Sequence, residues 1–243
     1  MTVVAVVDFE TTGIGPDDEP VSVGVIAVRV DERGGILEDL GRYEGLREPS
    51  VPIHPRAQAV HGMSMADLRG HQFDEPALRA LLERADVLVA HNAAFDARML
   101  SAIMSVQTPW RCSYRQFPWG TLQNRKLDTV CGALCVERPA IHGAMRDAES
   151  LLACLLKRTG KTDRSRTYLQ TLLNKPAFDV AAPQWTSTPY SGASKGGGAK
   201  SRSTTSWPYV LGKVVATVCL AVVALLVAIF GAVLQIGGEK RRK

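Results

Sequence analysis

Apolar residues in the first part of the chain fall into two short runs rich in valine, at residues 3–7 and 21–30. Runs of this length and composition are typical of buried β-strands. Residues 31–35 carry a turn signal between two extended segments, so residues 21–48 predict a β-hairpin. We therefore expect the first strands to be antiparallel neighbours in one sheet.

After residue 55 the pattern changes to helices that alternate with strands. Residues 87–90 predict another buried strand, and Asn92 is a candidate N-cap for the helix that follows it. The predicted helices are 76–84, a segment beginning near Ala93, 126–135 and 144–158. The leucines of the last helix form one apolar face. This succession of elements indicates a three-layer α/β domain.

The composition changes from about residue 161, and residues 183–206 are rich in Ser, Thr, Gly and Lys. Such a segment is typical of a flexible linker. Residues 214–234 then form an uncharged run of 21 residues, which is long enough to cross a bilayer core. The predicted organisation is a globular domain at 1–160, a basic Gly/Ser-rich linker at 161–209, a transmembrane helix at 210–236 and a basic tail at 237–243.

The net charge of +5 is unevenly distributed along the chain. Residues 1–160 hold 17 Lys and Arg against 21 Asp and Glu, a net charge of −4, whereas residues 161–243 hold 12 against 3, a net charge of +9. The basic excess therefore belongs to the tail. The chain has five cysteines, an odd number, and no secretory signal before them, which argues against a disulfide framework.

Three acidic motifs carry the candidate chemistry. Asp8 and Glu10 are two residues apart at the end of the first predicted strand, so both side chains point to one face. Asp96 lies in the first turns of a helix, and Asp147 lies at the start of another. His142 is predicted on the loop before that helix, because positions five apart on a helix differ by about 140°. Taken alone, the acidic pair is more typical of a solvated strand end than of a metal site, and Asp96 is more typical of a helix-start acid favoured by the helix dipole.

The three motifs together, in this order and spacing, resemble the DEDDh 3′-to-5′ exonucleases, a family within the ribonuclease H-like fold. Residues 60–63 (Val-His-Gly-Met) and 126–129 (Lys-Leu-Asp-Thr) resemble two further segments of that family. The resemblance covers about residues 2–158. It implies a three-layer domain with a mixed central sheet and an enzyme that releases 5′-mononucleotides from a nucleic acid with a free 3′ end.

The resemblance also implies a role for each residue of the motifs. Asp8, Glu10, Asp96 and Asp147 would hold two divalent cations, Mg²⁺ or Mn²⁺, and His142 would be the general base that activates the attacking water. Four converging carboxylates repel one another, and hard cations with oxygen ligands remove that repulsion. Two such ions about 4 Å apart can stabilise both the attacking and the leaving oxygen. A histidine with a pKa of about 6.5 can accept the proton of the water near neutral pH.

By the same resemblance, Thr11, Thr12 and Gly13 line the pocket for the 3′-terminal nucleotide, and His61 and Asn92 flank it. A purely structural role remains an alternative for His61 and for Asn92. His61 could be an ordinary loop residue, and Asn92 could serve only as a helix cap.

Three alternative functions stay open at this point. A catalytically inactive nucleic-acid-binding module usually lacks one or more of the acidic residues, and none is missing here. An exonuclease that trims RNA or short oligoribonucleotides would differ in the shape of its pocket, which the sequence does not disclose. DNA is preferred because the motifs are close to those of the polymerase-associated group. The third alternative is chiefly a membrane or partner-binding protein in which the nuclease is secondary.

The apolar run at 214–234 is expected to anchor the protein in a lipid bilayer. The alternative, a buried helix of the globular domain, is disfavoured because the run follows a linker and lacks a polar face. Trp207 and Tyr209 precede it as candidate interfacial anchors, and basic residues 240–243 follow it. The two sides of the run carry equal numbers of basic residues, so the positive-inside rule does not decide the orientation. The orientation is predicted instead from the missing N-terminal signal and the location of nucleic-acid substrates. We expect a single-pass C-terminal anchor with the catalytic domain in the cytoplasm.

Overall fold

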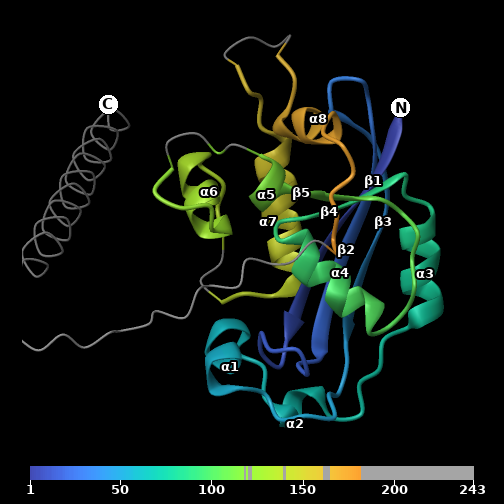
Figure 1. Ribbon diagram of the computed structural model, residues 1–243, viewed down its shortest axis with the longest axis vertical. Helices are drawn as coiled ribbons and strands as arrows, with labels where there is room; N and C mark the ends of the chain where they lie inside the picture. Colours follow the sequence, from blue (N-terminus) through green and yellow to red (C-terminus); the bar gives the residue numbers. More distant parts are fainter. Residues whose placement is uncertain (118, 120–121, 139–140, 161–164, 182–243) are drawn as a thin grey trace, which may run out of the picture. The chain divides into compact units, whose positions relative to one another are not determined.

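The computed structural model describes residues 1–117, 119, 122–138, 141–160 and 165–181. Its centre is a five-stranded sheet with the order β3-β2-β1-β4-β5 (Figure 1). The strands are β1 Thr2–Thr11, β2 Pro20–Val30, β3 Ile36–Leu46, β4 Val87–Ala90 and β5 Trp110–Cys112.

Strand pairing confirms the predicted mixed sheet. β1 is antiparallel to β2, with Thr2 opposite Val30 and Asp8 opposite Gly24. β2 is antiparallel to β3, which confirms the predicted hairpin. β4 pairs parallel to β1, and β5 pairs parallel to β4. β1 extends past the valine run to Thr11, because pairing with β2 continues through the polar residues that follow.

Helices cover both faces of the sheet, which gives the predicted three-layer arrangement (Figure 1). α7 packs on β1 and β2 and is flanked by α6 and α8, whereas α3 and α4 pack on the opposite face. The helices are α1 Pro55–His61, α2 Met65–Leu68, α3 Glu75–Glu83, α4 Ala93–Ser101, α5 Ser113–Gln116, α6 Leu127–Ala133, α7 Ala144–Leu156 and α8 Tyr168–Leu173.

Alternation along β1 decides which layer each side chain enters. Val4 and Val6 belong to the apolar core under α7, whereas Val3 and Val7 belong to the core under α3 and α4. Side chains two residues apart on a strand share a face. The carboxylates at positions 8 and 10 therefore continue the even-numbered set toward α7.

Gly24 lets the first turn of α7 rest directly on the sheet. A Cβ atom at Gly24 would lie 2.4 Å from the backbone nitrogen of Met145 and 2.5 Å from the carbonyl carbon of Ala144. Gly24 is also the residue opposite Asp8 in the β1–β2 pairing. This close approach therefore sets the height of the start of α7 above the carboxylates of β1.

Replacing Gly24 with alanine is expected to destabilise the protein and to reduce the activity that the sequence predicts. The added methyl group must push away backbone atoms, which typically costs about 1–3 kcal/mol in a packed core, and it lifts the start of α7 away from β1. Urea unfolding and initial rates measure the two effects. Gly132→Ala in α6 is the control, because its Cβ meets no atom within 4 Å. Equal stability of the Gly24→Ala variant and the native protein would contradict this account.

The ordered fold extends past residue 160, where the sequence analysis placed the end of the globular domain. α8 lies within the predicted linker, and Leu169 and Leu172 are buried in the core under α7. Phe178 then forms an antiparallel bridge to Trp110 at the edge strand β5. α8 has only two buried residues, so its local pattern in the sequence is weak.

The predicted transmembrane segment at 214–234 lies outside the described residues. Among the residues that the structure describes, no helix is long and apolar enough to cross a membrane.

Candidate active site

The predicted catalytic residues meet in one cleft of about 590 Å³ at the C-terminal end of β1. Asp8 and Glu10 project from β1, Asp96 lies in the first turn of α4, and Asp147 lies in the first turn of α7. His142 lies on the loop before α7, where the sequence analysis placed it, and all five residues line the cleft. Three segments that are distant in sequence, namely β1, the start of α4, and α7 with its preceding loop, therefore contribute to a single site.

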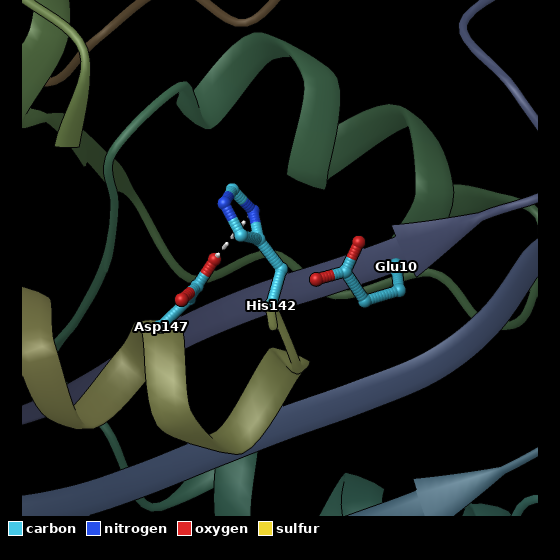
Figure 2. A group of neighbouring side chains, drawn as sticks. All are labelled: Glu10, His142 and Asp147. Atoms are coloured by element: carbon cyan, nitrogen blue, oxygen red, sulfur yellow. Dashed lines mark ion pairs between the residues drawn. The ribbon is translucent and has the colours of Figure 1, made fainter. Parts of the chain in front are cut away.

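Glu10, His142 and Asp147 form the tightest part of this cleft. One ligand atom from each side chain lies within 4.8 Å of the others. Figure 2 shows the three side chains pointing toward a common space from β1, the loop and α7. The Nδ1 atom of His142 is 3.5 Å from Oδ2 of Asp147. The loop is held at α1, because the backbone N–H of His142 donates to the carbonyl of Val60 at 3.3 Å.

The carboxylates are difficult to ionise in the absence of a cation. Burial, followed by the charges of Asp96, Asp147 and Glu10, raises the pKa of Asp8 well above its usual range. Burial, with the charge of Asp147, raises the pKa of Glu10 to about 7. Burial is also the main cause that raises the pKa of Asp96 to about 8. The folded protein thus places negative charge where it is costly unless positive charge is supplied.

This arrangement predicts how stability depends on pH in EDTA. Because the pKa values of Glu10 and Asp96 are raised, the folded state binds more protons than the unfolded state between about pH 4 and pH 8. Stability should therefore fall as pH rises from about 4 to about 8 and then level off, by roughly 2–4 °C in melting temperature per kcal/mol. Calorimetry should show a shallower fall for Asp96→Asn. A melting temperature that rises with pH in this window would contradict the assigned repulsion.

The donor set of the cleft fits a hard divalent cation. Carboxylate oxygens are the preferred ligands of Mg²⁺ and Mn²⁺. For Asp8 and Glu10, burial raises the pKa values more than the nearby positive charge lowers them, and burial is also the largest cause of the raised pKa of Asp96. Glu10 and Asp147 are the carboxylates grouped most tightly, and Asp8 and Asp96 line the same cleft. The residues present therefore match the predicted metal site in chemical type.

An adjoining pocket of about 450 Å³ shares Phe9, Glu10 and Phe95 with the cleft. Three residues of the predicted nucleotide pocket line it, namely Thr11, Gly13 and His61. Thr12 and Asn92 do not line this pocket. Asn92 lines the main cleft, where it is the N-cap residue of α4 without a capping hydrogen bond from its side chain.

Thr12 and His61 are held by local hydrogen bonds. The hydroxyl of Thr12 is buried, donates to Oδ1 of Asp18 at 2.7 Å and accepts from the N–H of Glu19, which fixes the loop after β1. Nε2 of His61 lies 3.2 Å from the carbonyl oxygen of Thr11, and Nδ1 accepts from the N–H of Met63. Burial lowers the pKa of His61, so it is a neutral side chain that joins β1 to α1.

The cleft also contains residues that the sequence analysis did not assign. Arg138 is the main one, because its buried side chain contacts both Asp147 and His142. No spacing motif marks this arginine. His91 also lines the cleft, but its two ring nitrogens face the hydroxyl of Ser113 and the carbonyl of Arg125 at 2.8 and 2.7 Å. These contacts give His91 a structural role.

Known proteins with similar sequences are DNA polymerases. The chain is 34% identical over 99 residues to a PolC-type DNA polymerase III of Thermotoga petrophila, which covers 39% of this chain and 7% of the relative. It is 30% identical over 156 residues to the PolC-type DNA polymerase III of Halalkalibacterium halodurans, which covers 60% of this chain and 10% of the relative. The chain thus spans a tenth or less of the length of these relatives.

Similar solved structures support the fold. The zinc-bound complex of E. coli exonuclease I with single-stranded DNA aligns with a TM-score of 0.52 and 18% identity, over 63% of this chain and 39% of that chain. Another structure of exonuclease I aligns with a TM-score of 0.50 and 18% identity, over 63% and 40%. The exonuclease family model RNase_T matches residues 5–155, more than half of the chain. This chain therefore belongs to the exonuclease family, as a member of its DEDDh 3′-to-5′ type.

Proposed function

We propose that this protein is a metal-dependent 3′-to-5′ exonuclease that removes 5′-mononucleotides from the free 3′ end of a nucleic acid, preferably DNA. The observation that carries the proposal is the convergence of four carboxylates and His142 in one cleft, beside a pocket of about 450 Å³. Family membership gives the reaction class, and the adjoining pocket gives room for a terminal nucleotide.

The chemistry assigned to the residues follows from their positions. Asp8, Glu10, Asp96 and Asp147 would hold two cations, Mg²⁺ or Mn²⁺, which when bound would supply positive charge near the attacking and leaving oxygens. Nδ1 of His142 faces Asp147. We assign Nε2 as the atom that accepts the proton of the attacking water, because Nδ1 is the ring nitrogen that lies 3.5 Å from Asp147.

The preference for DNA rests on the relatives. The PolC-type proteins are named as DNA polymerases, and the exonuclease I complex contains single-stranded DNA. The alternative substrates are RNA and short oligoribonucleotides, which a protein distinguishes from DNA through the 2′-hydroxyl.

Degradation of matched substrates tests the proposal. Single-stranded DNA, duplex DNA and RNA of one sequence are incubated with the purified protein in Mg²⁺, in Mn²⁺ and in EDTA. We expect 5′-mononucleotides from DNA, no reaction in EDTA and protection by a blocked 3′ end. Faster degradation of RNA than of DNA would change the proposed substrate but leave the proposed exonuclease reaction in place. Binding without cleavage in either metal would instead favour a catalytically weak nucleic-acid-binding module.

We also propose that residues 214–234 anchor the protein in a membrane with the nuclease in the cytoplasm. The anchor is supported by hydropathy, and the orientation by the location of nucleic-acid substrates. A run of 21 uncharged residues rising about 1.5 Å each matches a hydrocarbon core of about 30 Å.

The full-length protein is expected to pellet with membranes and to resist carbonate extraction. The chain shortened to end at Ser206 should be soluble and active, since it keeps every residue of the cleft. Partition of the full-length protein into the soluble fraction without detergent would overturn the anchor. Digestion of the nuclease domain by protease added outside intact cells would overturn only the orientation.

A further inference from the structure

Arg138 occupies the acidic cleft in a way that the proposed catalytic mechanism does not use. Its side chain is only 7% exposed. Nε and Nη2 lie 3.0 and 2.5 Å from the two carboxylate oxygens of Asp147. Nη1 also pairs with Asp128, at the start of α6. The guanidinium group thus joins two carboxylates from different helices.

The same guanidinium group lies against the proposed base. Nη1 is 3.3 Å from Nε2 of His142, and Nη2 is 3.3 Å from Nδ1. Arg138 is therefore in contact with the two residues of α7 and its preceding loop that the proposed function requires. Its charge also lowers the pKa values of Asp8 and Glu10, although burial outweighs this effect.

A bidentate arginine and a divalent cation make competing demands on Asp147. The guanidinium group of Arg138 donates hydrogen bonds to both carboxylate oxygens of Asp147. A cation bound to either oxygen would place at least two positive charges beside a guanidinium group that cannot lose its proton. Like charges at such distances in a buried site repel strongly. The two cations are therefore alternatives for Asp147.

We infer that Arg138 is the resident counter-ion of the metal-free cleft and that it competes with the divalent cation for Asp147. In the metal-free protein it partly offsets the repulsion among the carboxylates and holds the side chains of Asp147 and His142 in place. Binding of the metal moves the guanidinium group off Asp147. Arg138 is thus a positioning residue that weakens metal affinity. This inference rests on the proposed metal site.

Titration calorimetry with Mg²⁺ and Mn²⁺ on the full-length protein in detergent tests the competition. Arg138→Met removes the charge and the hydrogen bonds, and Arg146→Met removes the same charge from an exposed position on α7. We expect the dissociation constant to fall roughly tenfold for Arg138→Met, within the 5- to 150-fold range of coupled sites, and to stay unchanged for Arg146→Met. A purely structural role for Arg138 predicts the opposite sign, with weaker metal binding after its removal.

Two further measurements test the competition if Arg138→Met does not fold in EDTA. Arg138→Lys keeps a positive charge but loses the planar fork, so its dissociation constant should lie between those of the native protein and Arg138→Met. In the native protein, the Nε–H resonance of Arg138 should exchange slowly with water in EDTA and rapidly in saturating Mg²⁺. The resonance is identified by its absence from the spectrum of Arg138→Lys.

The outcomes separate this inference from the proposed function. Failure of the native protein and of both Arg138 variants to bind either metal would overturn the metal site. Metal binding by the native protein, with an unchanged or raised dissociation constant in folded Arg138→Met, would overturn the competition alone. An Nε–H resonance of Arg138 that still exchanges slowly with water in saturating Mg²⁺ would also overturn the competition alone.

Discussion

Replacing Asp8 with asparagine is expected to abolish nuclease activity and, at the same time, to stabilise the metal-free protein. The carboxylate of Asp8 lies in the cleft beside Glu10, and burial with three neighbouring acids raises its pKa. Asparagine has almost the same shape but carries no charge. It removes a proposed metal ligand and relieves repulsion, so loss of activity and gain of stability share one cause.

The expected effects are large enough to measure separately. We expect the cleavage rate to fall by on the order of 10² to 10³, as for other losses of preorganised charge stabilisation in an active site. The melting temperature in EDTA at pH 8 should rise by about 2–4 °C for each kcal/mol of repulsion removed. Asp17→Asn, at an exposed position after β1, is the control for both. Full activity in Asp8→Asn would overturn the metal-site assignment.

The sequence was sufficient to predict β1, β2, β3 and β4, because these strands have strong local signals. The valine runs of β1 and β2 and the turn between β2 and β3 specify neighbouring antiparallel strands. α3 and α7 were also predicted close to their observed bounds, because each buries a leucine-rich face.

Shorter elements were missed because their stability comes from tertiary contacts. α1 has seven residues, of which only His61 is buried, so it has no apolar period to detect. The three-residue strand β5 is defined by its pairing with β4 and by the bridge from Phe178. A signal that depends on distant partners is not visible in a local pattern.

The same distinction applies to the cleft. Asp8, Glu10, Asp96, His142 and Asp147 could be proposed because each belongs to a short motif, and the order of the motifs along the chain adds information. Arg138 could not be proposed, because no motif marks it and its place in the cleft depends on tertiary contacts with Asp128 and Asp147. Thr12 shows the converse. It lies in a motif, but its hydroxyl donates to Asp18, and Thr12 does not line the pocket.

Replacing His142 with alanine is expected to lower the turnover number by roughly 10² to 10⁴ while metal affinity is retained. The reason is the proposed division of labour, in which carboxylates hold the cations and the imidazole accepts a proton. The variant distinguishes a general base from a metal ligand. Both roles are open to His142, because it is also close enough to Glu10 and Asp147 to bind a metal with them.

Calorimetry with Mg²⁺ and rate measurements on the same preparation of His142→Ala distinguish the two roles. A general base affects the rate, and its loss should leave the dissociation constant for Mg²⁺ within about twofold, whereas loss of a ligand from the metal typically weakens binding far more. His71→Ala is the control, because His71 lines a different pocket between α2 and α3. If metal affinity in His142→Ala collapses together with the rate, His142 is a ligand, and another group must accept the proton of the attacking water.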